Sequence, residues 1–385
     1  KRQGPDILFF WVARMIIAGY NFRNKPPFSK VYLTGIVRDQ KGKKMSKQLG
    51  NSPDALALIN EYGADSVRVG LMLSSVAGND LLFDESLCKQ GKNFTNKIWN
   101  AYRLIDSWKV DSKIDQPVYS EESILCFENT FNKILEIVNE HFEKYRISDA
   151  LMSIYKLIWD DFCSWLLEIN KPDYGSPIDE ISYIQINNQF QKTLKLLHPF
   201  MPFISEEIWH LVKSRSIKES LVITKWPEQK EYDELVLHNY DMLKEIVGSV
   251  RNFRKENNLK PKSPLSLFYF KTNSIEFKKV ISRIVHLDKI EFSDKKIDKR
   301  GGVFRVGVTE FFVPLETFID PQKESIKINE ELKYLNGFLN SISKKLSNPR
   351  FVENAPNDVI ELERKKAKDS TEKINNLKIR LENLN

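Results

Sequence analysis

Apolar residues recur at intervals of three and four positions from about residue 85 to residue 225, with polar residues between them. Ile98, Tyr102 and Ile105 share one helical face in this way. A helix buries one stripe of side chains, so this period predicts several amphipathic helices that pack into a bundle.

A second periodic region lies at the end of the sequence, where apolar residues again step by four and three. Asn348-Pro349 and Ala355-Pro356 interrupt it, and proline disfavours helix at the residue before it. We therefore predict an antiparallel coiled-coil hairpin. Its seam residues are Ile328, Leu332, Leu335, Leu339, Ile342 and Leu346 in the first helix, and Ile374, Leu377, Leu381 and Leu384 in the second.

Strand patterns occupy two other regions. Near the start, Val31–Val37 is rich in β-branched and aromatic residues and predicts a strand within an alternation of helix and strand, as in the closing part of a doubly wound sheet. Further on, a helix over Val250–Lys255 precedes predicted strands at Leu265–Phe270 and Gly302–Val308, with a helix between them. This second region predicts a small α+β module.

Composition narrows the class of protein. The 385 residues suggest two to four domains, and the net charge of +7 favours an anionic partner. No apolar run is long enough to span a membrane. Cys88, Cys126 and Cys163 lie far apart without metal-binding spacing, so we expect them to be buried and reduced, and we predict no metal site and no structural zinc.

The residues with the clearest chemistry lie in the loop after the first predicted strand. Lys44 and Lys47 stand three positions apart between Gly42 and Gly50, and Asp54 opens the next helix. A lysine ammonium is a compact charge on a long, flexible stem, so it can follow charge that moves during a reaction. We interpret the loop as a binding site for polyphosphate.

The string Lys44-Met45-Ser46-Lys47-Gln48 resembles the KMSKS signature of class I aminoacyl-tRNA synthetases, with Gln48 in place of the last serine. The resemblance implies that Lys47 stabilises the pyrophosphate leaving group, that Lys44 assists, and that ATP binds with Mg²⁺. The ATP-binding residues it implies are Gly4, Asp6, Gly35, Lys44, Ser46 and Lys47.

The segment Gly4–Met15 is similar to the version of the ATP-ribose segment found in the valine-specific members of this family. The resemblance assigns Asp6 to the ribose hydroxyls, and Ile7 and Trp11 to the wall of a valine pocket. Four residues apart on a helix, Ile7 and Trp11 would share one face and form an apolar wall.

A third motif, Leu196–Trp209, resembles the helix pair in the anticodon-binding domain of the Val, Ile, Leu and Met enzymes. Pro199 and Pro202 are expected to break one helix, and Ser205 to N-cap the next. We expect Ile204, Ile208 and Trp209 in the core, and His198 in a structural role.

The histidine-rich first signature of class I enzymes is absent, as is the family's editing domain. We therefore interpret the chain as the C-terminal portion of a longer cytoplasmic, monomeric enzyme, which alone would be inactive and would not proofread. The predicted domains are residues 1–85, the C-terminal part of a Rossmann-like catalytic domain with the KMSKS-type loop and connecting module; 86–235, a helical anticodon-binding domain; 236–322, the α+β module; and 323–385, a coiled-coil tRNA-binding arm.

The resemblance implies valine, ATP and the valine tRNA as partners. The candidate tRNA-binding residues are Arg251, Arg254, Lys344, Lys345, Lys365 and Lys366. Asp65 and Arg68 are interpreted as partners in ion pairs, with tRNA contact as the alternative. Three other functions remain open: the isoleucine-specific enzyme, a non-catalytic tRNA-binding protein on the same scaffold, and a structural protein that oligomerises through its coiled coil.

Overall fold

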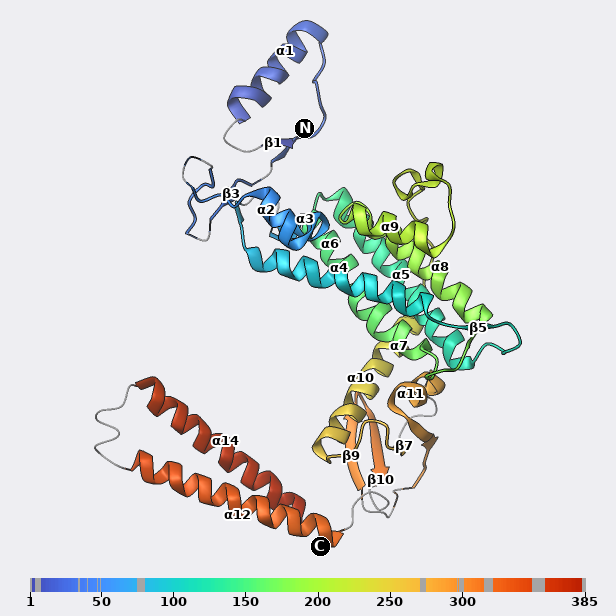
Figure 1. Cartoon of the computed structure of the whole chain (residues 1–385), viewed down its shortest axis with the longest axis vertical. Coiled ribbons are helices and arrows are strands. Elements are labelled where there is room, and N and C mark those ends of the chain that lie inside the picture. Colours follow the sequence, from blue (N-terminus) through green and yellow to red (C-terminus); the bar gives the residue numbers. More distant parts are fainter. Residues whose placement is uncertain are drawn as a thin grey trace. The chain divides into compact units, whose positions relative to one another are not determined.

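The computed structural model describes residues 2–3, 8–33, 35–39, 41–46, 48, 50–74, 80–270, 275–295, 297, 301–314, 321–347 and 357–382. The chain divides into two compact units, one of residues 1–248 with 275–286 and the other of residues 249–274 with 287–385 (Figure 1). Most of the described chain is helical, as the periodicity predicts.

The first part of the chain alternates helices with very short strands. A π-helical turn η2 (Leu8–Ala13) runs into α1 (Arg14–Arg23). Strands β1 (Arg2–Gln3) and β2 (Tyr32–Leu33) pair in parallel, and so do β3 (Val37–Arg38) and β4 (Leu81–Leu82). The single strand predicted over residues 31–37 is therefore wrong. The chain changes its strand partner between β2 and β3, so the apolar run serves two separate pairs.

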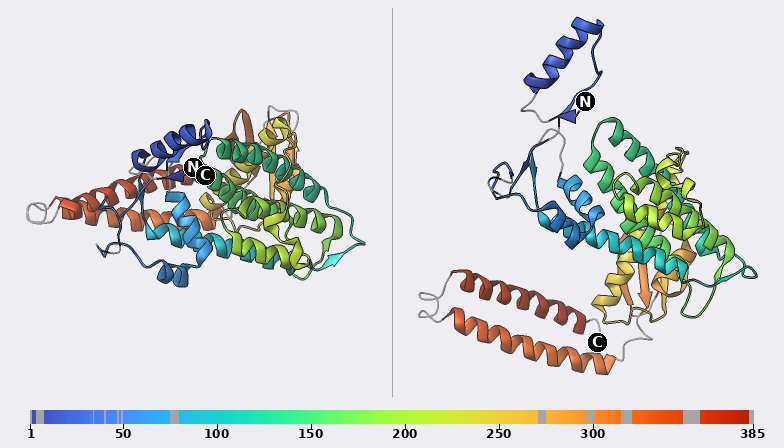
Figure 2. Two further views of the ribbon diagram at one scale, coloured as in Figure 1. Left: turned by 90° about the horizontal axis from the view of Figure 1, so that it is seen from above. Right: turned by 45° about the horizontal axis from the view of Figure 1, so that its top comes forward.

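A helical bundle follows, as predicted, and its helices lie close together in each view (Figures 1 and 2). Phenylalanine rings fill its centre: Phe162 lies 5.1 Å from Phe190 and 5.5 Å from Phe127, measured between ring centroids. The helical elements of this unit are α2 (Ala55–Tyr62), α3 (Ala64–Ser74), α4 (Glu85–Asp106), α5 (Val118–Glu143), α6 (Ile147–Lys156), the π-helical η4 (Leu157–Leu166), α7 (Leu167–Asn170), α8 (Glu180–Leu197), α9 (Pro202–Val212), the 3₁₀ turns η5 (Ile217–Glu219) and η6 (Leu221–Ile223), and α11 (Lys278–Val285). Helix α10 (Glu234–Glu256) contributes residues to both units, and β5 (Val110–Asp111) pairs in parallel with β6 (Ile178–Asp179).

Helices α3 and α4 pack at unusually short range because glycines face the neighbouring backbone. A Cβ added to Gly91 would lie 2.5 Å from the carbonyl oxygen of Ser66. A Cβ on Gly70 would lie 2.8 Å from the main-chain nitrogen of Cys88. Main-chain atoms cannot move aside as a flexible side chain can, so this contact fixes α3 firmly on the bundle.

The second unit contains a four-stranded sheet in the order β8-β7-β10-β9, in which β7 is parallel to β8 and β10 is antiparallel to both of its neighbours. The strands are β7 (Leu265–Phe270), β8 (Leu287–Phe292), β9 (Gly301–Val306) and β10 (Thr309–Pro314). The prediction found β7 and, displaced by one to two residues, β9. It missed β10, which directly follows the predicted strand, and it also missed β8. Strand β8 lies at the edge of the sheet, buries only Leu287 and is otherwise largely polar.

Helices α12 (Pro321–Leu346) and α14 (Asn357–Glu382) run side by side in opposite directions in all three views (Figures 1 and 2). Their apolar residues meet between the two helices, where Ile328 and Ile374 are 2% and 5% exposed. The predicted helical hairpin is thus present.

Cys88, Cys126 and Cys163 are buried, as expected, and burial raises the pKa of the Cys126 and Cys163 thiols to about 12. Within the described ranges, none of the helices combines the length and the apolar character that crossing a lipid bilayer requires.

Candidate functional site

The loop between β3 and α2 begins with a tight hairpin that carries the first signature lysine. The main-chain N–H of Asp39 donates to the carbonyl of Lys43 at 2.8 Å, and that of Met45 donates to the carbonyl of Val37 at 3.1 Å. Gly42 lies at the turn with a φ of 77°, a left-handed conformation that favours glycine. The backbone of this loop is therefore closed by its own hydrogen bonds.

The carboxylate of Asp39 lies at the centre of the hairpin. Its Oδ1 accepts from the main-chain N–H groups of Lys41 and Lys43, at 3.0 and 2.9 Å, and its Oδ2 accepts from the Asn51 side chain at 3.0 Å. The bond from Asn51, followed by that from the Lys43 main chain, holds the pKa of Asp39 below its ordinary value. Asp39 is therefore ionised at neutral pH and acts as an acceptor for three donors.

The amide of Asn51 contacts the signature itself. Its Nδ2 donates to the carbonyl of Lys44 at 3.2 Å, and its Oδ1 accepts from the main-chain N–H of Ser46 at 3.0 Å. Asn51 precedes α2, which Asp54 caps by accepting from the main-chain N–H of Leu56, as the sequence predicted. The signature is thus connected both to the hairpin and to the following helix.

A second acidic residue fixes the base of the loop. Asp80 forms an ion pair with Arg38, and its Oδ1 accepts from the main-chain N–H of Ile36 at 3.1 Å. Arg38 also donates to the carbonyl of Gly42 at 3.2 Å. Arg38 therefore connects the turn of the hairpin to the start of β4.

The structure describes only part of the predicted ATP site. Lys44 is exposed and Ser46 is half-buried, while Gly35 lies between β2 and β3. The other predicted residues, Gly4, Asp6, Ile7 and Lys47, lie outside the described residues. Trp11 lies in η2 and is 55% exposed. Its pairing with Ile7 stays a prediction.

Asp65 and Arg68 connect α3 with the junction between α8 and α9. Asp65 accepts from the main-chain N–H of Ile204 at 2.7 Å and from that of Phe203 at 3.3 Å. Arg68 donates to the carbonyls of Pro199 and Phe200, at 3.0 and 3.1 Å. This geometry corrects the ion-pair interpretation, because both side chains bind main-chain groups at this junction.

The same junction corrects the prediction for Ser205. Helix α9 begins at Pro202, so Ser205 lies inside the helix, fully buried. Its hydroxyl donates to the carbonyl of Met201 at 2.6 Å and lies 2.8 Å from Nδ1 of His198. Because the single hydroxyl hydrogen points to Met201, Nδ1 of His198 carries a hydrogen and donates to Ser205.

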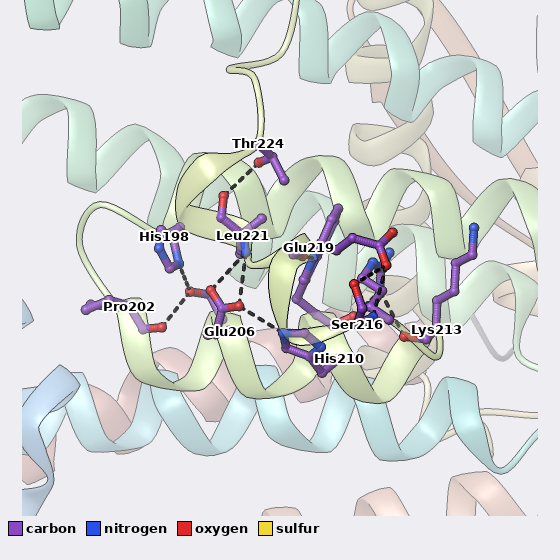
Figure 3. Close-up of polar contacts among 12 residues, drawn as sticks. His198, Pro202, Glu206, His210, Lys213, Ser216, Glu219, Leu221 and Thr224 are labelled. Carbon is purple, nitrogen blue, oxygen red and sulfur yellow. Dashed lines mark hydrogen bonds and ion pairs between the residues drawn. The ribbon is translucent and has the colours of Figure 1, made fainter.

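Glu206 continues this network along α9 (Figure 3). Its carboxylate accepts from the main-chain N–H of Leu221 at 3.0 Å and contacts Nε2 of His210 at 3.0 Å. Trp209, buried as predicted, donates its indole N–H to the carbonyl of Glu219 at 3.0 Å. These contacts attach residues 216–224 to the bundle. The contact of His198 with Ser205 inside α9 is in keeping with the structural role expected for His198.

The candidate tRNA-binding residues differ sharply in their surroundings. Arg251 is exposed, whereas Arg254 is 4% exposed and donates to the carbonyl of Lys260 at 3.0 Å and to that of Ser263. The predicted tRNA contact of Arg254 is inconsistent with this burial, because its guanidinium is used to hold the turn before β7.

On the helical hairpin, Lys344 and Lys365 are exposed. Glu363 lies 2.8 Å from Lys366 and 4.0 Å from Lys345. The ammonium of Lys366, above all, lowers the pKa of Glu363. The carboxylate of Glu363 therefore partly offsets the positive charge of Lys345 and Lys366.

Sequence reasoning missed the residues that shape the loop: Arg38, Asp39, Asn51 and Asp80. One signal was available, because Asp39 followed three residues later by Gly42 is typical of a type I turn. Among the described residues, no group of three or more His, Cys, Asp or Glu side chains is arranged to hold a metal ion.

Three family models match the chain in succession. Residues 2–84 match the tRNA synthetases of class I (I, L, M and V), residues 126–269 match the anticodon-binding domain of tRNA ligase, and residues 320–385 match the valyl tRNA synthetase tRNA-binding arm.

Curated relatives extend the match across the chain. A valine–tRNA ligase of Christiangramia forsetii is 50% identical over 383 residues, which is 99% of this chain and 44% of the relative. The valine–tRNA ligase of Thermotoga maritima is 36% identical over 386 residues, again 99% of this chain and 44% of the relative. The chain thus spans less than half the length of these relatives. Among solved structures, Mycobacterium tuberculosis methionyl-tRNA synthetase aligns with 57% of this chain and 45% of its own, at 20% identity and a TM-score of 0.44.

Proposed function

We propose that this chain, which belongs to the valine–tRNA ligase family, forms part of an enzyme that activates valine with ATP and joins it to its tRNA. The geometry of the signature loop carries this proposal. The hairpin presents Lys44 to solvent on a backbone held by Asp39 and Asn51, and Lys47 follows three residues later.

In the proposed first step, a carboxylate oxygen of valine attacks the α-phosphorus of ATP. The bond to the bridging oxygen of the β-phosphate breaks, giving valyl-adenylate and pyrophosphate. A carboxylate needs no deprotonation, so the step depends on alignment and on stabilising the charge that develops on the leaving group. We assign that stabilisation to Lys47 with assistance from Lys44, while Mg²⁺ accompanies ATP as part of the substrate.

In the second step the valyl group passes to the terminal adenosine of the tRNA. The matches to an anticodon-binding domain and a tRNA-binding arm support a role for the bundle and the α12–α14 hairpin in holding that tRNA. We retain Arg251, Lys344, Lys345, Lys365 and Lys366 as candidate contacts. Lys344 and Lys365 are favoured, because Glu363 partly offsets the charge of Lys345 and Lys366.

We propose a monomer that acts in the cytoplasm, where protein synthesis takes place. The α12–α14 hairpin supports the monomer, because Ile328, Leu332 and Ile374 are buried within it and do not form an open seam for another chain. We propose that the enzyme has no structural zinc, and that this chain contributes no proofreading.

The test is amino-acid-dependent exchange of pyrophosphate into ATP by the complete protein that carries this chain. We expect exchange with valine, much weaker exchange with isoleucine, and loss of the valine-dependent rate in Lys47→Ala. Equal rates with isoleucine would favour the isoleucine-specific alternative. No exchange with any amino acid would refute the proposed activity and favour a non-catalytic tRNA-binding protein.

A further inference from the structure

The side chains of Asp39 and Asn51 are hydrogen-bonded to each other across the signature loop, twelve positions apart in sequence. Between them lie Lys44 and Ser46, and each of these two is held by Asn51 through its main chain. The pair therefore joins the two ends of the loop and contacts its middle.

The chemistry at position 51 is specific to an amide. Asn51 donates through Nδ2 to Asp39 and to the carbonyl of Lys44, and it accepts through Oδ1 from Ser46. A carboxylate could only accept, and a hydroxyl has a single hydrogen to donate. Asparagine supplies both donors and the acceptor in one fixed plane.

The chemistry at position 39 is specific to an acceptor. Asp39 receives hydrogen bonds from two main-chain N–H groups, of Lys41 and Lys43, besides the one from Asn51. Hydrogen bonds to an ionised carboxylate are stronger than neutral ones. The carboxylate thus fixes the backbone of the hairpin, including the residue directly before Lys44.

We propose that Asp39 and Asn51 are positioning residues that hold the backbone on both sides of Met45 in the conformation from which Lys44 reaches the departing pyrophosphate. This inference rests on the proposed function. Charged groups stabilise a transition state most when their positions are set before the reaction. Holding the backbone at Lys44 does this for a side chain that is itself flexible.

Two variants distinguish a positioning role of Asp39 and Asn51 from a general effect on the stability of the fold. Asn51→Asp keeps the size of the side chain and its acceptor for Ser46, but it removes the donor to Lys44 and places a second carboxylate against Asp39. The exchanged pair Asp39→Asn/Asn51→Asp restores a donor and an acceptor between the two positions and removes the repulsion. It does not restore the donor to Lys44, so recovery should be partial.

The experiment compares these variants in the complete protein, with Asn100→Asp as the matched control on the exposed face of α4. We expect Asn51→Asp to lower the kcat for valine-dependent pyrophosphate exchange about 10- to 100-fold, the effect of losing a hydrogen bond that involves charge. Transfer of valine from preformed valyl-adenylate to tRNA, and the KM for valine, should stay within about twofold of the parent. The exchanged pair should recover part of the lost kcat.

Amide hydrogen exchange supplies a readout independent of activity. In Asn51→Asp the two carboxylates repel each other, which should separate positions 39 and 51. The N–H groups of Ser46 and Lys43 should therefore exchange faster in this variant than in the parent, while the thermal midpoint of the bundle stays unchanged. An Asn51→Asp protein that exchanges pyrophosphate as fast as an active parent would overturn the inference, and so would equal losses in exchange and transfer. A parent without valine-dependent exchange would instead refute the proposed function on which the inference rests.

Discussion

The main-chain N–H of Ile204 donates to Oδ2 of Asp65 at 2.7 Å, so a side chain of α3 caps the first turn of α9. Phe203 donates to the same carboxylate, while Met201, the residue that precedes α9, provides no side-chain cap. The N-terminus of a helix exposes N–H groups without partners in the helix, and a carboxylate satisfies them. The segment that follows the signature loop is thereby attached to the bundle that the family model assigns to anticodon binding.

Asp65→Ala should lower the free energy of unfolding by about 1–3 kcal/mol, because it leaves two part-buried N–H groups in the first turn of α9 without their acceptor. Urea denaturation of this chain measures the effect. The comparison is Asp84→Ala, which removes an exposed cap of α4 and should cost about 1 kcal/mol or less. A smaller loss for Asp65→Ala than for Asp84→Ala would contradict the cross-helix cap.

Gly91→Ala should destabilise the chain by about 1–3 kcal/mol or more, since the new methyl group would meet the carbonyl oxygen of Ser66. Gly248→Ala is the matched control within α10, because a Cβ there meets nothing within 4 Å. Alanine favours helix over glycine, so the control should gain up to about 1 kcal/mol. Thermal unfolding of both variants gives the comparison, and similar midpoints would refute the close contact of α3 and α4.

His198 should make stability depend on pH. Burial lowers its pKa below the ordinary value of 6.5, so the unfolded chain binds the proton more readily than the folded chain. The stability contributed by the neutral imidazole is therefore complete above pH 6.5 and is lost as the pH falls through the lowered folded value.

The control is His198→Gln, whose amide can still donate to Ser205 but carries no charge. We expect the parent to lose more free energy of unfolding than this variant between pH 7.5 and pH 5.5. Parallel losses in the two proteins would show that His198 does not carry the effect.

The lysines of the hairpin should differ in their contribution to tRNA binding. Glu363 already partly offsets the charge of Lys345 and Lys366, and Lys344 and Lys365 are exposed on the same hairpin. Lys344→Ala/Lys365→Ala should weaken binding and reduce the slope of log affinity against log salt by about one for each phosphate that the variant no longer neutralises. Lys345→Ala/Lys366→Ala should change that slope less. A larger change for the second pair would contradict this assignment.

The helices were predictable wherever one face is apolar. The spacing of Ile98, Tyr102 and Ile105 predicted α4, and the seam from Ile328 onward predicted α12. The edge strand β8 was not predictable, because it buries only one residue and its sequence therefore shows little alternation of apolar and polar residues.

The site was predictable for residues that belong to a motif. Lys44 and Lys47 were predicted from the signature, and their role stays a prediction. Asp39 and Asn51 contact main-chain groups of the loop, and any polar residue in a turn can do the same, so the sequence does not single them out. Ser205 was wrongly predicted to cap α9, because serine is common at the N-cap position. The true cap, Asp65, is 139 positions from Ile204, and nothing local in the sequence indicates that contact.

Binding of this chain to valine-specific tRNA, compared with isoleucine-specific tRNA at two salt concentrations, tests the central claim most directly. We predict tighter binding of the valine-specific tRNA at both concentrations, with affinities that fall as salt rises. Equal affinity for the two tRNAs, or no binding of either, would contradict the claim that this chain recognises the tRNA of a valine–tRNA ligase.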